Sequence, residues 1–142
     1  MMKLFVDTWG WVVLKDPHEP RHAAAVSCFE RYRNLPSGIV TSDYVLDETF
    51  TLVFARRPFD EAWRFAEGIL KSEAKKLIRI ERMGQERFSR TVELRKRLAD
   101  KPRISFTDLS SMVIMLELGT RDVLTADRHF SHAGFGFHIL PD

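Results

Sequence analysis

The chain contains little cysteine, proline or glycine, and it has no long apolar run. Cys28 is the only cysteine among 142 residues, which excludes a disulfide framework and a zinc site built from cysteines. No apolar segment approaches the roughly 18 residues that a membrane-spanning helix needs. Asp7 interrupts the first apolar run, so we do not expect a signal peptide. With 44% hydrophobic and 30% charged residues, the sequence predicts one globular domain over residues 1–142, which we expect to be cytoplasmic.

Charge is unevenly distributed along the chain. Residues 71–103 contain twelve lysines or arginines and five acidic residues, so this segment carries +7 and the remainder −5, for a total of +2. A basic segment of this kind is typical of proteins that bind a polyanion. A solvated helix face with Glu–Arg pairs would produce the same composition, and charge alone does not separate the two interpretations.

Short apolar runs alternate with longer amphipathic segments. We expect strands at 3–6, 39–41, 77–80, 123–125 and 137–140. We expect helices at 8–14, 22–33, 43–55, 59–71, 85–99 and 108–118. In the fourth helix we expect one apolar side, made by Phe59, Trp63, Ala66 and Leu70. Strands separated by helices imply parallel crossovers, so the predicted fold is α/β, a three-layer α/β/α sandwich.

Four acidic residues are predicted to lie at one edge of this sheet. Asp7 and Asp127 each follow a strand, and ligands of parallel sheets bind beyond the carboxyl ends of the strands. Glu48 and Asp108 each lie near the start of a helix, on a side shared with apolar residues. Glu48 shares the side of Val45 and Leu52, whereas its neighbour Asp47 lies on a more polar side, so we prefer Glu48.

Each acidic residue also has a structural interpretation. Asp7 or Asp127 could cap the helix that follows, Asp108 could form a capping box with Ser105, and Glu48 could pair with an arginine. Four carboxylates at one edge of the sheet nevertheless favour a shared metal site. Mg²⁺ and Mn²⁺ prefer oxygen ligands, and such a site can activate water against a phosphodiester. Hydroxyls of Thr8, Thr41 and Thr125 could orient ligands or water there.

Motifs in this order resemble the PIN-domain family, and within it the VapC-type toxins. The matching segments are Phe-Val-Asp-Thr at 5–8, the stretch 41–49 that ends in Asp-Glu-Thr, Ser-Phe-Thr-Asp at 105–108, and Val-Leu-Thr-Ala-Asp-Arg-His-Phe at 123–130. Asp108 and Asp127 are 19 positions apart, which the family pattern requires, and the resemblance covers essentially the whole chain.

The resemblance implies a central five-stranded parallel sheet of order 3-2-1-4-5 and a metal-dependent endoribonuclease. Asp7, Glu48, Asp108 and Asp127 would be the catalytic residues, with Mg²⁺ or Mn²⁺ held by the three aspartates. It further implies an RNA substrate, a homodimer, and a small VapB-like antitoxin that inserts into the active-site groove.

Several assignments stay open at this point. A housekeeping PIN nuclease and a non-catalytic RNA-binding module are the alternatives to a toxin, although no family acid is missing. A haloacid-type phosphatase is excluded, because it needs Asp-x-Asp at the first strand and Trp9 stands at the second of these positions. Arg128 could contact phosphate, and His129 could touch substrate. Arg56-Arg57 and the run Arg95-Lys96-Arg97 could follow an RNA backbone.

Overall fold

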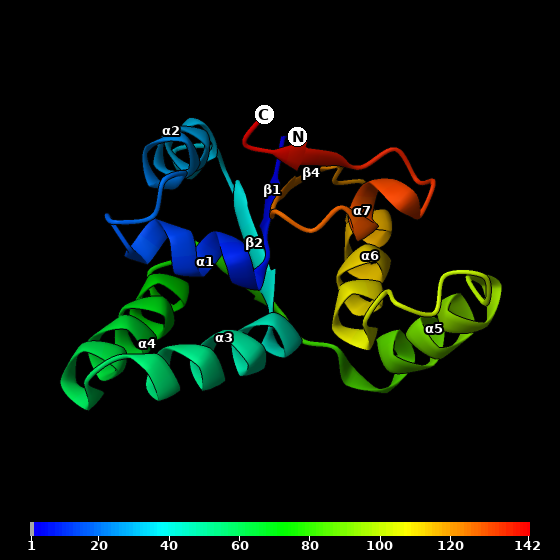
Figure 1. Ribbon diagram of the computed structural model, residues 1–142, viewed down its shortest axis with the longest axis horizontal. Helices are drawn as coiled ribbons and strands as arrows, with labels where there is room; N and C mark the ends of the chain where they lie inside the picture. The colour runs from blue at the N-terminus through cyan, green and yellow to red at the C-terminus, as the bar shows by residue number, and fades with distance from the viewer. Residues whose placement is uncertain (1) are drawn as a thin grey trace.

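The computed structural model describes residues 2–142 and contains one parallel sheet of five short strands (Figure 1). The strands are β1 Leu4–Val6, β2 Ile39–Ser42, β3 Arg79–Glu81, β4 Asp122–Leu124 and β5 His138–Leu140. Their order is β3-β2-β1-β4-β5, and all four pairings are parallel, so the predicted sheet order is confirmed. β1 lies at the centre, and its three residues are completely buried, as expected for a strand covered on both faces.

Helices cover both faces of the sheet, which confirms the three-layer α/β/α class. They are α1 Thr8–Lys15, α2 His22–Arg33, α3 Asp43–Arg56, α4 Phe59–Ala74, α5 Gly84–Arg97, α6 Phe106–Leu118 and α7 His129–His132. In Figure 1 α1 to α4 lie on one side of the strands, and α5 to α7 lie on the other. α1 packs very close to the sheet, because a Cβ on Gly10 would lie 2.7 Å from the Leu124 carbonyl oxygen. This contact brings the start of α1 to the ends of β1 and β4.

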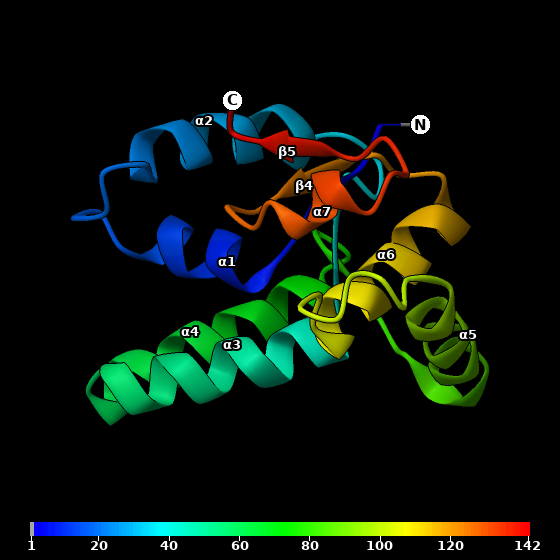
Figure 2. The same cartoon turned by 45° about the vertical axis from the view of Figure 1, so that its right-hand side comes forward.

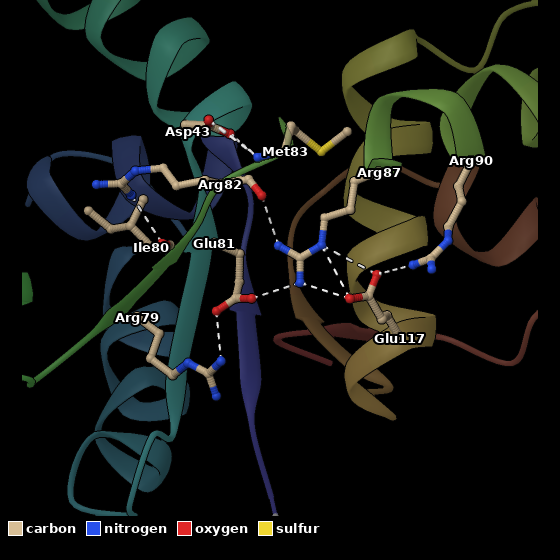
Figure 3. A network of polar contacts seen from close by, with 9 residues as sticks. All are labelled: Asp43, Arg79, Ile80, Glu81, Arg82, Met83, Arg87, Arg90 and Glu117. Atoms are coloured by element: carbon tan, nitrogen blue, oxygen red, sulfur yellow. Dashed lines mark hydrogen bonds and ion pairs between the residues drawn. The ribbon is translucent and has the colours of Figure 1, made fainter. Parts of the chain in front are cut away.

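Local capping accounts for where α3 and α6 begin and where α6 ends. Ser42 Oγ accepts a hydrogen bond from the Val45 amide, and Ser105 Oγ accepts one from the Asp108 amide. Gly119 ends α6 in the left-handed conformation, with φ of 68°. Asp43, the first residue of α3, accepts a hydrogen bond from the Met83 amide and thereby ties α3 to the end of β3 (Figure 3).

Three local predictions differ from the structure. β3 begins at Arg79, because Leu77 is 57% exposed and lies outside the sheet. β5 begins at His138, after Phe137 has entered the core. The four-residue helix α7 was not predicted. Phe130 is its only buried residue, and one apolar residue cannot produce the periodic pattern by which a helix is predicted.

The apolar side predicted for α4 was wrong in part. The residues that α4 buries are Ala62, Ala66 and Ile69. Phe59, Trp63 and Leu70 are 66%, 52% and 52% exposed. Only Ala66 of the expected side is buried, and the large aromatic residues face outward.

None of the helices within residues 2–142 combines the length and the apolar character that crossing a bilayer requires.

The basic segment forms ion pairs with acidic residues of neighbouring elements. Figure 3 shows Arg87 of α5 between Glu81 of β3 and Glu117 of α6. Arg87 Nη2 lies 2.9 Å from Glu81 Oε1 and 3.0 Å from Glu117 Oε1, and Nη1 donates to the Arg82 carbonyl. Arg90 also pairs with Glu117, at 2.8 Å. The interpretation as a helix face with Glu–Arg pairs therefore holds for much of α5.

Removing Arg87 should destabilise the protein. In Arg87→Ala the Glu81 side chain, only 12% exposed, keeps a pair with Arg79 but loses its more buried partner. We expect a loss of about 2–4 kcal/mol in the free energy of unfolding, measured by urea denaturation. Arg33→Ala is the control. The Arg33 and Glu30 side chains that form its ion pair are 59% and 48% exposed, so this pair contributes only about 0.5 kcal/mol to stability. Equal losses in the two variants would contradict this role for Arg87.

Candidate active site

All four predicted acidic residues line one pocket beyond the carboxyl ends of β1 and β4. The pocket, called the acidic pocket below, has a volume of about 410 Å³. Asp7 follows β1 and Asp127 follows β4, while Glu48 comes from α3 and Asp108 from α6. In Figure 1 the helices α1 and α3 approach this edge from one side, and α6 and α7 approach from the other. Segments far apart in the sequence thus bring four carboxylates to one place.

Asp7 lies at the bottom of the acidic pocket and is only 5% exposed. It precedes α1 but makes no side-chain cap hydrogen bond to the residues described, which leaves the capping interpretation without support. Thr125 Oγ1 donates to Asp7 Oδ2 at 2.8 Å, whereas buried Oδ1 has no hydrogen-bond partner within residues 2–142. Burial, together with the nearby charges of Glu48 and Asp127, raises the pKa of Asp7 to about 6 despite the Thr125 hydrogen bond.

Asp108, Asp127 and His129 form the second part of the site. One ligand atom from each lies within 4.8 Å of the others. Burial raises the pKa of Asp108, and the neighbouring Asp127 and Asp7 add to this effect. Burial tends to raise the pKa of Asp127 as well. Hydrogen bonds from Asp108 and from the His129 amide, the latter at 2.9 Å, outweigh this effect and hold the pKa of Asp127 below its usual value. One carboxyl of this pair therefore holds a proton more readily than the other.

The His129 ring faces both carboxylates. Its Nδ1 atom lies 3.1 Å from Asp127 Oδ1 and 3.8 Å from Asp108 Oδ2. These distances permit attraction to a protonated ring, but Nδ1 is not aligned for a hydrogen bond to any residue described. His129 thus borders the acidic pocket at the α7 side.

The structure distinguishes Glu48 from Asp47. Both side chains are exposed, but only Glu48 lines the acidic pocket. Glu48 shares its side of α3 with Leu52, and both residues line this pocket, so the Glu48 side chain is exposed there and does not enter the core. Glu48 has no ion-pair partner among residues 2–142, so the arginine-pair interpretation has no support.

Two of the three predicted threonine hydroxyls line the acidic pocket, whereas the third threonine and Arg128 do not. Thr8 and Thr125 line the acidic pocket, and Thr125 also accepts a hydrogen bond from the Asp127 amide at 3.0 Å. Thr41 does not line it. Its hydroxyl donates to the Val6 carbonyl and accepts from the Trp11 ring, so it joins β2, β1 and α1. Arg128 is exposed and also lies outside the pocket lining.

Sequence reasoning did not single out several residues that line the acidic pocket, among them Val12, Glu19 and Arg103. Arg103 precedes α6 and was counted only as part of the basic segment, yet it lines the acidic pocket together with Arg56. Its position two residues before the Ser105 cap was the available signal, since Asp108 follows in the same motif.

The donor set fits a hard divalent cation. Carboxylate oxygens are the ligands that Mg²⁺ and Mn²⁺ prefer, and Asp7 supplies a buried oxygen with no partner within residues 2–142. Burial is the main cause of the raised pKa values of Asp7 and Asp108, and the negative charges of neighbouring carboxylates, which a positive charge would balance, add to it. A metal in this pocket would supply that balance.

Removing the Asp7 charge should stabilise the metal-free protein. A pKa of about 6, raised from 3.8, means that folding disfavours the ionised form, so stability falls as the pH rises through this range. We expect Asp7→Asn to gain about 1–3 kcal/mol in the free energy of unfolding at pH 7.5 in EDTA, and much less at pH 4. Urea denaturation at both pH values measures this. A variant less stable than the wild type at pH 7.5 would contradict it.

The chain is similar in fold to solved toxin structures. A crystal structure of VapC20 from Mycobacterium tuberculosis, described as a Sarcin-Ricin loop cleaving toxin, has a TM-score of 0.78 at 28% identity and covers 94% of this chain and 96% of that one. DNA-bound VapBC from Salmonella typhimurium has a TM-score of 0.71 at 16% identity, with 98% and 97% covered. VapBC2 from Rickettsia felis, bound to a promoter fragment, has a TM-score of 0.74 at 16% identity, with 97% of each chain covered. The last two support the fold alone.

Sequence comparison gives the same relationship. The 23S rRNA-specific endonuclease VapC20 of Mycobacterium tuberculosis is 31% identical over 132 residues, which span 93% of this chain and 95% of the relative. The PIN domain matches residues 4–136, so all four acidic residues lie inside the matched region. The resemblance seen in the motifs is therefore confirmed, and the chain belongs to the PIN-domain family, where it is similar to VapC-type toxins.

Proposed function

We propose that this chain is a Mg²⁺- or Mn²⁺-dependent endoribonuclease, the toxin of a toxin–antitoxin pair. The observation that carries the proposal is the acidic pocket, where four carboxylates meet and a buried Asp7 oxygen has no partner among the residues described. The similarity of this chain to a 23S rRNA-specific endonuclease supports RNA as the substrate. Residues 1–142 would act as a single nuclease domain.

Asp7, Asp108 and Asp127 would hold the metal. Bound there, it would supply a water of lowered pKa and a positive charge beside the phosphodiester. Thr125 orients Asp7 by donating to Oδ2, and Oδ1, which has no partner within residues 2–142, would be available to the metal. The His129 amide fixes Asp127 in the same way. Glu48, on the opposite wall, could orient the attacking water or share in a second metal.

The relatives suggest the substrate and the partners. VapC20 is described as cleaving the sarcin–ricin loop of 23S rRNA, and we propose this loop as the first RNA to test for the present chain. Two solved neighbours are VapBC proteins bound to DNA. We propose that this chain likewise pairs with a VapB-like antitoxin, which would insert into the active-site groove, and that it forms a homodimer in the cytoplasm.

Cleavage should require both metal and the acidic pocket. We expect purified protein to cut a sarcin–ricin loop hairpin or total RNA in Mg²⁺ or Mn²⁺, and to leave it intact in EDTA. Asp108→Asn should lower the rate at least about a hundredfold, because a metal ligand supports several kcal/mol of charge stabilisation. A gel assay of RNA cleavage measures both effects.

Glu48→Gln and Asp47→Asn form a matched pair in this assay. The two residues are adjacent and exposed, and each substitution removes one negative charge, but only Glu48 lines the pocket. We expect about a tenfold or greater loss for Glu48→Gln and little change for Asp47→Asn. Equal rates in wild type and in Asp108→Asn, over all these RNAs, would refute the proposed active site.

Growth separates a toxin from a housekeeping nuclease. We expect expression of the wild-type chain alone to arrest bacterial growth, and Asp7→Asn to relieve the arrest at equal protein level, because that variant loses a metal ligand. Colony counts after induction, with immunoblots for protein level, measure this. Normal growth with ample soluble, RNA-cleaving wild-type protein would favour the housekeeping role.

A further inference from the structure

A second hollow opens beside the acidic pocket. This side cleft, of about 420 Å³, is lined by residues 100–104, His129 and His132. It shares Arg103 and His129 with the acidic pocket, so the two hollows are adjacent. An RNA strand that lies over the carboxylates of the acidic pocket could therefore extend into the side cleft.

The charge of the side cleft suits a polyanion. Arg103 is exposed, and no carboxylate within residues 2–142 lies at ion-pair distance from it. Asp100 is the one acidic residue of the lining, and Lys101 already neutralises it at 2.9 Å. His132 adds an exposed ring, 6.4 Å from that of His129 between centroids. The lining thus contains an available guanidinium and two imidazoles.

The loop that carries Arg103 is held in place. Arg95 of α5 donates to the carbonyl oxygens of Leu98, Lys101 and Ile104, at 2.6, 2.7 and 2.7 Å. Arg95, which the sequence suggested might follow an RNA backbone, is therefore used to shape this loop. A guanidinium on a fixed loop loses less entropy when it binds a phosphate.

The hollow on the other side of the acidic pocket is less suited to phosphate. It shares Arg56 and Glu19 with the acidic pocket, and Lys15, Asp16 and Arg57 also line it. Arg57 pairs with Asp16 and Lys15 pairs with Glu61, each at 3.0 Å, so the remaining charges of this lining are those of Arg56 and Glu19, which offset each other. The side cleft is consequently the more favourable exit for a phosphate backbone.

We propose that the side cleft binds the RNA backbone next to the cleaved bond, and that Arg103 contacts a phosphate there. The proposal rests on the ribonuclease function proposed above. A guanidinium binds phosphate oxygens through paired N–H donors, and the histidine rings offer surfaces on which an unpaired base can stack. Arg103 would then hold substrate without taking part in the hydrolysis.

Salt-dependent binding tests the phosphate contact. The probe is a fluorescent, mixed-sequence single-stranded RNA, because phosphate contacts do not depend on sequence. Anisotropy is measured with Mn²⁺ in an Asp108→Asn background, which keeps the RNA uncut. We expect Arg103→Ala to weaken binding about fivefold and to reduce the slope of log Kd against log salt by about 0.7. Arg103→Lys should keep the slope.

Arg97→Ala is the matched control. Arg97 is also exposed and without an ion-pair partner in the described chain, and it lies outside both hollows. In the active protein, Arg103→Ala should raise KM with kcat within about twofold, while Arg97→Ala should change neither. Thermal melting checks that both variants are folded, and Arg103→Lys and Arg103→Gln provide further variants at this exposed position.

The outcomes separate this inference from the proposed function. If wild type cleaves RNA but Arg103→Ala binds and cuts like Arg97→Ala, the side cleft is not a substrate site and the nuclease proposal stands. If Arg103→Ala lowers kcat with KM unchanged, Arg103 acts at the reacting phosphate and the subsite is overturned. If wild type neither binds nor cleaves RNA, both proposals fail.

Discussion

The parallel pairing of β1 with β4 is the constraint on which the candidate site depends. It places Asp7 and Thr125 at the same end of adjacent strands, where Thr125 donates to one carboxylate oxygen of Asp7 and accepts from the Asp127 amide. Gly10 permits α1 to approach the Leu124 carbonyl closely, and the Asp7 amide donates to the same oxygen at 3.2 Å, which holds the residue that follows β1 against β4. Two carboxylates from distant parts of the chain are thereby held at fixed positions before any ligand binds.

Crowded carboxylates reduce the stability of the metal-free fold, and other parts of the structure offset that cost. The pKa values of Asp7 and Asp108 are raised because both carboxyl groups are buried and lie near other carboxylates. Stabilisation comes instead from the buried sheet and from the Arg87 network, which joins β3, α5 and α6 (Figure 3). Figure 2 shows α5 beside α6 at the far side of the molecule from α1, so this network is separate from α1 and its strand-end contacts.

Basic residues therefore have two distinct roles. Most arginines of the basic segment are engaged within the protein: Arg79, Arg82, Arg87 and Arg90 pair with glutamates, and Arg95 binds carbonyl oxygens. Arg103, in the same segment, is left without an acidic partner in the described chain and lies beside the carboxylates. The amino-acid composition does not distinguish these residues, because the net charge of a segment does not show which of its charges are neutralised by ion pairs.

The sequence alone determined the fold class, most element positions and three of the four acidic residues, and it favoured Glu48 over Asp47 as the fourth. Those signals are local, since strand hydrophobicity, the Ser42 and Ser105 caps and the motif spacing depend on neighbouring residues. Only the tertiary structure decided that Glu48 rather than Asp47 lines the pocket, that Thr41 bonds within the core, and that α4 buries alanines while Phe59 and Trp63 face outward. The position of each of these side chains depends on the residues that pack against it, and those residues are far away in the sequence.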